Sequence, residues 1–254
     1  MIQNRKGGCD GSDVATNDMA LFRPGDFDIT DRGIEIAGLE KGSRCLDIGC
    51  GEGDTVAHLV EDMGIEAEGI DMNLSMISRA KEKHPGINVK FGDGEFLDDY
   101  MSFTFDGVLM ECVLSLINIP DEALHEAYCV LKKGGKLIIS DLYHKNPDPK
   151  QMKAVEIEAE RLSRIPHKEG DCEDSPKRFV DFKFEGAFYE VPLKRQLEEI
   201  GYEVVAFEDR SRDLDGFIAG YLMDGGKLED LMTEVKPENS KDIGYFLLVA
   251  EKPM

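Results

Sequence analysis

Short apolar runs alternate with amphipathic stretches between Arg44 and Tyr143, and this alternation limits the possible folds more than any other feature of the chain. Runs such as "RCLDIG", "EAEGID" and "KLIISDLY" are typical of strands, whereas "DTVAHLVEDMG" carries apolar residues at helical spacing. Strands that alternate with helices form a mainly parallel sheet with helices on both faces. The sequence therefore predicts an α/β fold built on a doubly wound sheet.

Capping and breaking residues predict where several helices begin and end. We expect one helix from about Phe27 to Ala37, and a second capped by Asn73 and ended by Pro85–Gly86. A third is predicted to begin at Pro120 and to end at Gly134–Gly135.

Outside the alternating region, the sequence predicts an N-terminal tail, a C-terminal segment that completes the sheet and two stretches that belong to neither. Residues 191–252 predict a helix and two antiparallel strands. Two stretches fit no element of the sheet, 144–190 and about 211–240, and we expect them to be inserted caps over a site. The predicted organisation is a tail or lid at 1–25 followed by one domain at 26–254.

Composition excludes several classes of partner and location. The formal net charge of −22 over 254 residues repels phosphate backbones, so we expect neither nucleic-acid nor anionic-membrane binding. No run of about 18 apolar residues offers a membrane span, and the polar start "MIQNRKGGCDGSD" is unlike a secretory signal, so we expect a cytoplasmic protein. The cysteines form no CxxC pair and the histidines no i,i+4 pair, so no metal site is predicted.

The stretch "RCLDIGCGEGDTV" places glycines and acids together after the first predicted strand. Glycines at such a turn usually bind phosphate, but this loop lacks the Gly-Lys-Ser/Thr of a Walker motif. Gly49 and Gly51 match half of a dinucleotide fingerprint, and Asp54 replaces its third glycine. Two like charges about 4 Å apart repel by about 4 kcal/mol at an effective dielectric of about 20, so these acids favour a positively charged ligand without phosphate.

S-adenosylmethionine has the sulfonium, the ammonium and the ribose hydroxyls that such a loop would accommodate. Asp71 lies 24 residues after Asp47, at the end of the second predicted strand, where a carboxylate accepts from ribose hydroxyls. That position suits the ribose of a nicotinamide dinucleotide equally well. Asp93, in "FGDGE", can accept from an adenine amino group, with the backbone amides of Gly94 and Glu95 beside it.

These motifs, in this order, resemble class I S-adenosylmethionine-dependent methyltransferases of the small-molecule type. The matching segments are "LDIGCGEGD", "GIDMN", "GDGE", "FDGVLMECVL" and "LKKGGKLIISD". The resemblance covers about residues 26–143 and, more loosely, 191–252. It implies a Rossmann-like sheet of seven strands in the order 3-2-1-4-5-7-6, with strand 7 antiparallel. It also implies S-adenosyl-L-methionine as cofactor, S-adenosyl-L-homocysteine as product and a small-molecule acceptor.

The same resemblance implies a role for each matching residue. The methionine end of the cofactor would contact Asp47, Gly49, Gly51 and the backbone of Cys50; the adenosine would contact Asp71, Met72, Asp93 and Gly94; and the sulfonium side would face Glu111 and Cys112. The opening "FRPGDFDIT" also resembles a bacterial methyltransferase group associated with radical enzymes. That likeness implies a protein partner or a homodimer. It also implies that Arg23, or the segment around it, folds over the methionine portion of the cofactor.

The sequence leaves the chemistry of the acceptor open. Candidate bases are Glu111, Tyr143, His144 and His167, and none has a partner that the sequence identifies, so no catalytic residue is assigned. Two other functions remain: an NAD(P)-dependent oxidoreductase, and a non-catalytic subunit that binds the cofactor.

Overall fold

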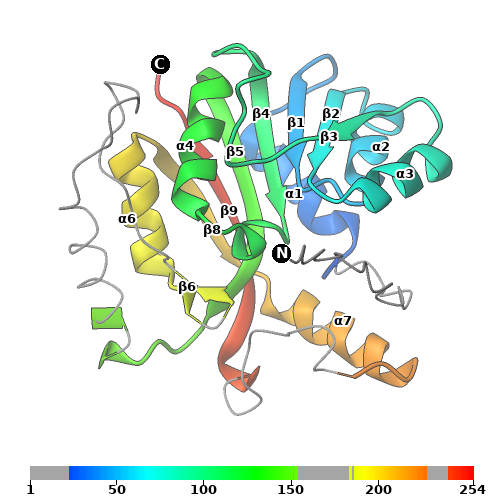
Figure 1. Ribbon diagram of the computed structural model, residues 1–254. Coiled ribbons are helices and arrows are strands. Elements are labelled where there is room, and N and C mark those ends of the chain that lie inside the picture. Colours follow the sequence, from blue (N-terminus) through cyan, green and yellow to red (C-terminus); the bar gives the residue numbers. More distant parts are fainter. Residues whose placement is uncertain (1–22, 151, 154–182, 185, 228–239) are drawn as a thin grey trace, which may run out of the picture.

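Parallel pairing of the alternating apolar runs builds the centre of the sheet (Figure 1). The computed structural model describes residues 23–150, 152–153, 183–184, 186–227 and 240–254. Adjacent parallel strands run in the order β3-β2-β1-β4-β5. Their bounds are β1 Arg44–Ile48, β2 Glu66–Asp71, β3 Asn88–Phe91, β4 Phe105–Glu111 and β5 Leu131–His144.

The closing strands complete the predicted order. β9 (Ile243–Glu251) pairs antiparallel with β5 on one side and with β8 (Glu203–Asp209) on the other. If β8 is counted as the sixth strand and β9 as the seventh, leaving out β6 and β7, the order is 3-2-1-4-5-7-6. The seventh strand, β9, is the antiparallel one. The predicted fold class is therefore confirmed.

A short hairpin was not predicted from the sequence. β6 (Lys183–Phe184) and β7 (Ala187–Phe188) pair with each other, and β7 meets β5 at Tyr143, which brings the sheet to nine strands. This hairpin lies in the predicted insertion 144–190, most of which, including His167, is outside the described residues. The second predicted insertion, 211–240, begins with helix α7 (Ser211–Met223).

The helices follow the predicted caps with one exception. The other long helices are α1 (Phe27–Ala37), α2 (Asp54–Glu61), α3 (Leu74–Lys83), α4 (Pro120–Val130) and α6 (Glu190–Ile200), and the short 3₁₀ helices are η1 (Leu114–Leu116) and η2 (Ser240–Asp242). α1 has the predicted bounds, and the Asn73 side chain caps α3 by accepting from the amides of Ser75 and Met76.

The predicted end of α4 at Gly134–Gly135 is wrong. The helix ends at Val130 because Leu131 is already extended, with ψ of 137°, and pairs with Phe105 across β4 and β5. Gly134 lies in the first part of β5, where its amide donates to the carbonyl of Lys252, the residue after β9, over 2.7 Å.

Alternating side chains of the sheet supply a separate core for each face. In β9, Phe246, Leu248 and Ala250 point to the face covered by α4 and α6. Tyr245, Leu247 and Val249 point to the opposite face, where α1, α2, α3 and α7 contribute buried side chains. Burial on both faces explains why the central strands are almost continuously apolar.

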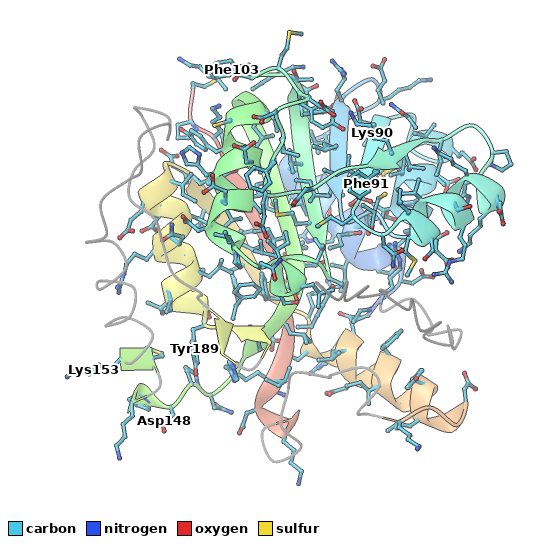
Figure 2. All side chains as sticks on the ribbon, viewed as in Figure 1. Lys90, Phe91, Phe103, Asp148, Lys153 and Tyr189 are labelled. Atoms are coloured by element: carbon cyan, nitrogen blue, oxygen red, sulfur yellow. The ribbon has the colours of Figure 1, made fainter. Side chains whose placement is uncertain are left out.

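The two edges of the sheet differ in function, because ligands of open parallel sheets bind at the carboxyl ends of the strands. Figure 2 shows this polarity: Phe103, which precedes β4, lies at the amino edge, and the buried Tyr189 lies toward the carboxyl edge. None of the helices in the described ranges is long and apolar enough to cross a membrane.

Candidate active site

Two adjoining cavities open at the carboxyl edge of the sheet. One, which we term the α1 cavity, measures about 230 Å³ and lies between the start of α1, the glycine loop and the ends of β4 and β5. The other, the β3 cavity, measures about 330 Å³ and lies over the ends of β2 and β3. Their linings share Gly49, Gly51, Met76 and Leu116, so together they form one continuous site.

The residues predicted from the motifs come together here. The α1 cavity is lined by Asp47, Gly49, Cys50, Gly51, Glu111 and Cys112, among others. The β3 cavity is lined by Gly49, Gly51, Asp71, Met72, Asp93 and Gly94, among others.

The glycine loop is shaped by close packing. Gly49 has φ of +76°, a region that L side chains rarely adopt. A Cβ at this position would lie 2.3 Å from Cγ2 of Val113, which follows β4. The glycine therefore lets the loop after β1 and the loop after β4 meet beneath the two cavities.

The amides of this loop are used inside the protein. The Gly49 and Cys50 amides donate to the carbonyl of Ile70 over 2.8 and 2.9 Å, and the Gly51 amide donates to Asp71 Oδ2 over 2.9 Å. A phosphate-binding loop needs such amides to be free for its ligand. These three are turned toward β2, so the Cys50 amide is used within the protein, and the backbone contact of Cys50 with the cofactor stays a prediction.

Two of the acids beside the loop do not face the ligand, contrary to the expectation from the sequence. Lys83 Nζ lies 2.8 Å from Asp54 Oδ2 and 3.3 Å from Glu52 Oε2, and His84 Nε2 lies 2.6 Å from Asp54 Oδ1. Neither acid lines the α1 cavity or the β3 cavity. Their charges are balanced by α3 and its C-cap, so Asp47 is the only one of the three acids that lines the α1 cavity or the β3 cavity.

Asp47 is an acid in a nearly closed environment, with 3% of its surface exposed. Burial raises the pKa of its carboxyl well above the usual range, and the negative charge of Glu111 raises it further, while the Arg23 guanidinium acts in the opposite direction. A cation placed beside Asp47 would favour the ionised carboxylate.

The β3 cavity carries a carboxylate on each of two neighbouring strand ends. Asp71 Oδ1 accepts from the Asn73 amide over 2.7 Å, and Asp93 Oδ1 accepts from the Glu95 amide over 2.9 Å. These bonds orient both carboxylates and leave them further acceptor capacity for hydroxyl or amino groups. Met72 is 58% exposed on the rim, where a flat ring could pack on it. The Glu95 amide is already occupied and does not complete the predicted adenine contact.

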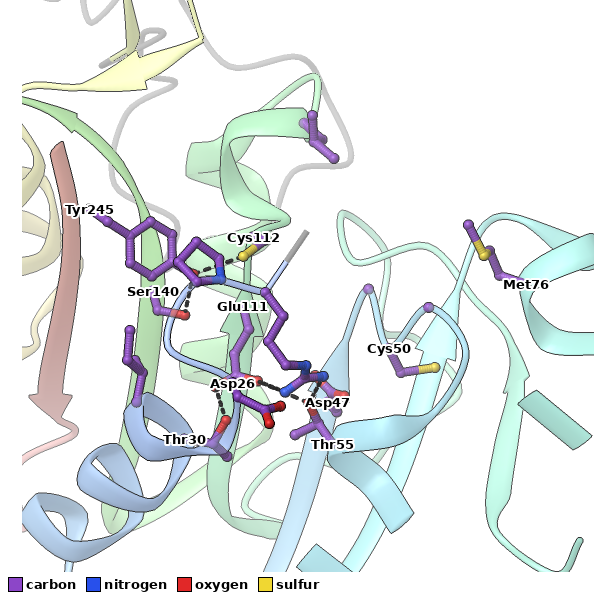
Figure 3. Close-up of a pocket in the computed structure, with 16 residues that line it drawn as sticks. Asp26, Thr30, Asp47, Cys50, Thr55, Met76, Glu111, Cys112, Ser140 and Tyr245 are labelled. Carbon is purple, nitrogen blue, oxygen red and sulfur yellow. Dashed lines mark hydrogen bonds and ion pairs between the residues drawn. The ribbon is translucent and has the colours of Figure 1, made fainter. Parts of the chain in front are cut away.

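Glu111 anchors one wall of the α1 cavity (Figure 3). Its Oε1 accepts from Thr30 Oγ1 over 2.8 Å, and its Oε2 accepts from Thr55 Oγ1 over 2.9 Å. Arg23 donates to Thr55 Oγ1 over 2.8 Å and lies 3.6 Å from Glu111 Oε2. Because both carboxylate oxygens are engaged, Glu111 joins α1, α2 and β4 and is not a free base.

The α1 cavity contains a second polar cluster, in which two residues that were not predicted from the sequence, Tyr245 and Ser140, join the predicted Cys112. Cys112, at φ of +55°, holds its Sγ 2.8 Å from the hydroxyl of Tyr245, which donates to Ser140 Oγ over 3.0 Å (Figure 3). Tyr245 belongs to β9 and is 133 residues from Cys112. No local motif links these residues, because strand order alone brings them together.

The other candidate bases lie away from both cavities. Tyr143 packs edge-on against Phe207, with ring centroids 5.5 Å apart, and His144 stacks on Tyr189 at 4.8 Å. His167 is outside the described residues. No three His, Cys, Asp or Glu side chains in the described part of the chain come together as a metal site.

Comparisons with known proteins agree on one family. Residues 39–181, more than half of the chain, match the family model of a methyltransferase domain. The demethylmenaquinone methyltransferase of Renibacterium salmoninarum is 32% identical over 111 residues, which cover 44% of this chain and 46% of that enzyme. The matched region thus spans less than half of the length of that relative.

Solved structures share the fold at low sequence identity. The [4+2]-cyclase SpnF superposes with a TM-score of 0.63 at 22% identity, covering 94% of this chain and 85% of that one. A phosphoethanolamine N-methyltransferase of Haemonchus contortus, in complex with S-adenosylhomocysteine, superposes with a TM-score of 0.60 at 16% identity over 92% of this chain and 54% of that one. The sheet order, the joined cavities and the family match together show that the chain belongs to the methyltransferase domain family, among the class I S-adenosylmethionine-dependent methyltransferases.

Proposed function

We propose that this chain transfers the methyl group of S-adenosylmethionine to a small-molecule acceptor and releases S-adenosylhomocysteine. The observation that carries the proposal is the arrangement of carboxylates along the joined cavities. Asp47 lies in the α1 cavity, Asp71 and Asp93 lie in the β3 cavity, and the loop amides between them are occupied. This arrangement suits a cationic nucleoside, and the amides of Gly49, Cys50 and Gly51 are already bonded and not available to a diphosphate.

The residues present fit each part of that cofactor. Asp47 and Arg23 would hold the ammonium and carboxylate of the methionine portion. Asp71 would accept from the ribose hydroxyls, while Asp93 and Met72 would contact the adenine. The Haemonchus contortus enzyme, which shares this fold and was solved in complex with S-adenosylhomocysteine, supports the choice of cofactor.

When bound, the cofactor supplies a methyl carbon that its sulfonium has already activated. The acceptor atom would take this methyl carbon while the electron pair of the carbon–sulfur bond stays on sulfur, and the proton of the acceptor would pass to water. The protein aligns the reacting groups and excludes water. Glu111 contributes to alignment through its contacts with Thr30 and Thr55, because its oxygens are occupied.

Calorimetry on the purified protein tests the proposal directly. S-adenosylmethionine and S-adenosylhomocysteine are expected to bind with Kd values on the order of micromolar, and NADH is expected to give no heat. Asp71→Asn should weaken both ligands, and Asp99→Asn, at an exposed position outside both cavities, is the matched control. Binding of NADH in place of the nucleosides would overturn the proposal in favour of the oxidoreductase.

A non-catalytic role is separated from catalysis by turnover. A panel of small alcohols, phenols, amines and thiols with methyl-labelled cofactor should yield a labelled product from at least one class. Cofactor binding without any product, also in the presence of a protein captured from the native cell, would favour the binding subunit. The cytoplasmic location, the protein partner and the link to radical enzymes stay predictions from the sequence.

A further inference from the structure

The α1 cavity contains a chain of three polar groups that the proposed cofactor contacts leave unused. Cys112 Sγ, the Tyr245 hydroxyl and Ser140 Oγ are joined by contacts of 2.8 and 3.0 Å, and all three residues line the cavity (Figure 3). Tyr245 and Ser140 are each 2% exposed. Buried polar groups are costly unless they are hydrogen-bonded, and these three meet that requirement by bonding to one another at the wall of the cavity.

The direction of these hydrogen bonds leaves one donor free. Three hydrogens, one each on the Cys112 thiol, the Tyr245 phenol and the Ser140 hydroxyl, are available for two contacts, so one of them is left over. Burial raises the pKa of both Cys112 and Tyr245, which keeps these protons in place near neutral pH. With the Tyr245 hydroxyl donating to Ser140 Oγ and the Cys112 thiol donating to the phenol oxygen, the remaining hydrogen is that of Ser140, which lines the cavity.

The charges around this donor limit the chemistry of its partner. The carboxylates of Asp26, Asp47 and Glu111 line the cavity, and the only cation among its described lining residues is Arg23. Arg23 contacts Thr55 and Glu111 and is the residue proposed to hold the carboxylate of the cofactor. An acceptor with a phosphate group would meet the carboxylates of Asp26 and Glu111 in a partly closed space, where repulsion between like charges is poorly screened.

The rest of the lining is apolar on the side of α1. Pro24 and Ile29 face the cavity there, and Leu116 closes it from the loop after β4. These side chains favour an apolar body for the molecule that occupies the space beside Ser140.

We infer that the methyl acceptor is an uncharged, largely apolar molecule with a hydroxyl or carbonyl oxygen that accepts a hydrogen bond from Ser140 Oγ. Tyr245 is a positioning residue, because its own hydrogen bond to Ser140 orients that donor toward the cavity. This inference rests on the proposed methyl transfer, since the cofactor must occupy the Asp47 side for the acceptor to lie on the Ser140 side.

The test uses the full chain saturated with S-adenosylhomocysteine and three probes of similar size. Hydroquinone, phenyl phosphate and benzylamine represent the uncharged, anionic and cationic classes, and saturation-transfer NMR reports their Kd values. Hydroquinone is expected to bind at least about tenfold more tightly than phenyl phosphate, because only the phosphate is repelled by the carboxylates of Asp26 and Glu111.

Variants then locate the hydrogen bond. Ser140→Ala should raise the Kd of hydroquinone about tenfold. Tyr245→Phe should raise it by a smaller factor of about three, because the Ser140 hydroxyl remains but is no longer oriented. The double variant should be no weaker than Ser140→Ala alone. Both single variants should leave the affinity for S-adenosylhomocysteine within about twofold, and Ser140→Cys restores a weak donor at similar volume. Tyr202→Phe, which removes a buried hydroxyl bonded to the Leu124 carbonyl, is the matched control.

Separate outcomes overturn the two proposals. If S-adenosylhomocysteine does not bind, the proposed function fails. If it binds but phenyl phosphate or benzylamine is preferred, or if hydroquinone does not bind or ignores the loss of the Ser140 hydroxyl, the acceptor assignment fails and methyl transfer stands. Thermal unfolding confirms that each variant is folded, and if Ser140→Ala does not fold, Ser140→Cys and Tyr245→Phe decide the question.

Discussion

The two cavities of the site are built in different ways. In the β3 cavity, Asp71 and Asp93 are each oriented by an amide two residues further along the chain, and Asp71 also accepts from the Gly51 amide, 20 residues away. In the α1 cavity, Thr30 and Thr55 reach Glu111 from 81 and 56 residues away. One cavity thus rests on turn chemistry at single strand ends, and the other rests on the packing of three distant elements.

This difference predicts different responses to substitution. A change in the β3 cavity should alter ligand affinity and leave the fold nearly intact, because the residues around it are fixed by their own turns. A change in the α1 cavity should alter both, because the same bonds that shape the cavity also join α1 and α2 to β4.

The largest effect is expected at the junction of the two cavities. Gly49→Ala would place a Cβ 2.3 Å from Val113 and force a side chain into φ of +76°. We expect a loss of about 2–4 kcal/mol of stability and of measurable binding of S-adenosylhomocysteine. Denaturant unfolding and calorimetry measure the two effects. Gly38→Ala is the matched control: its φ is +65° with no atom within 4 Å of the added Cβ, so it should cost only about 1 kcal/mol. Equal losses in both variants would show that conformation, and not close packing, requires Gly49.

The second-largest effect is expected at Asp71, the carboxylate proposed to bind the ribose hydroxyls. Asp71→Asn should raise the Kd of S-adenosylhomocysteine about 10- to 100-fold, because a charged acceptor of hydroxyl hydrogen bonds becomes neutral. The melting temperature should change little, which calorimetry and thermal unfolding on one preparation establish together. A fall in stability comparable to that of the Gly49 variant would contradict the local origin of the β3 cavity.

Glu111→Gln is the corresponding change in the α1 cavity. The amide cannot accept on both sides, so either Thr30 or Thr55 loses its acceptor and Arg23 loses its charged partner. We expect about 1–3 kcal/mol of destabilisation, together with weaker binding of S-adenosylhomocysteine. Glu35→Gln, on the exposed side of α1, should be nearly neutral in both measurements. If Glu111→Gln changed affinity without changing stability, the distinction between the cavities would not hold.

The buried carboxyl of Asp47 predicts a pH dependence. Its pKa in the folded protein is raised by burial, so its contribution to stability is present below the unfolded pKa of about 4 and is lost as pH rises through the folded value. A bound ammonium favours the ionised form, so binding of S-adenosylhomocysteine should release a proton and tighten as pH rises toward the folded pKa. Asp47→Asn should bind more weakly and lose this slope. Calorimetry in buffers of different ionisation enthalpy counts the proton, and an unchanged slope in the variant would assign it to another group.

The smallest effect concerns His58, outside both cavities. Burial lowers its pKa, but hydrogen bonds to Asp31 and Asp62 outweigh burial and raise it overall. Its stabilising contribution is therefore full below the unfolded pKa of about 6.5 and disappears as pH rises through the folded value. His58→Gln should remove less than about 1 kcal/mol at pH 6 and still less at pH 8, as measured by urea unfolding. A larger loss at pH 8 would reverse the assigned direction.

Strands, helix caps and strand-end residues depend on neighbours along the chain, and these could be predicted from the sequence. Apolar periodicity predicted the parallel strands, Asn73 predicted the cap of α3, and the residues after β1, β2 and β3 predicted the lining of the β3 cavity. Strand ends of a parallel sheet share one edge, so these residues had to meet once the fold class was known.

Two features of the site could not be predicted from the sequence: which charged side chains face the cavities, and which residues lie opposite the glycine loop. Glu52 and Asp54 look like ligand-facing acids in sequence, yet Lys83 and His84 of the α3 region pair with them. Tyr245 reaches Cys112 and Ser140 because β9 inserts between β5 and β8. The physical reason is that side-chain pairing across elements depends on strand order and helix packing, which local spacing does not encode.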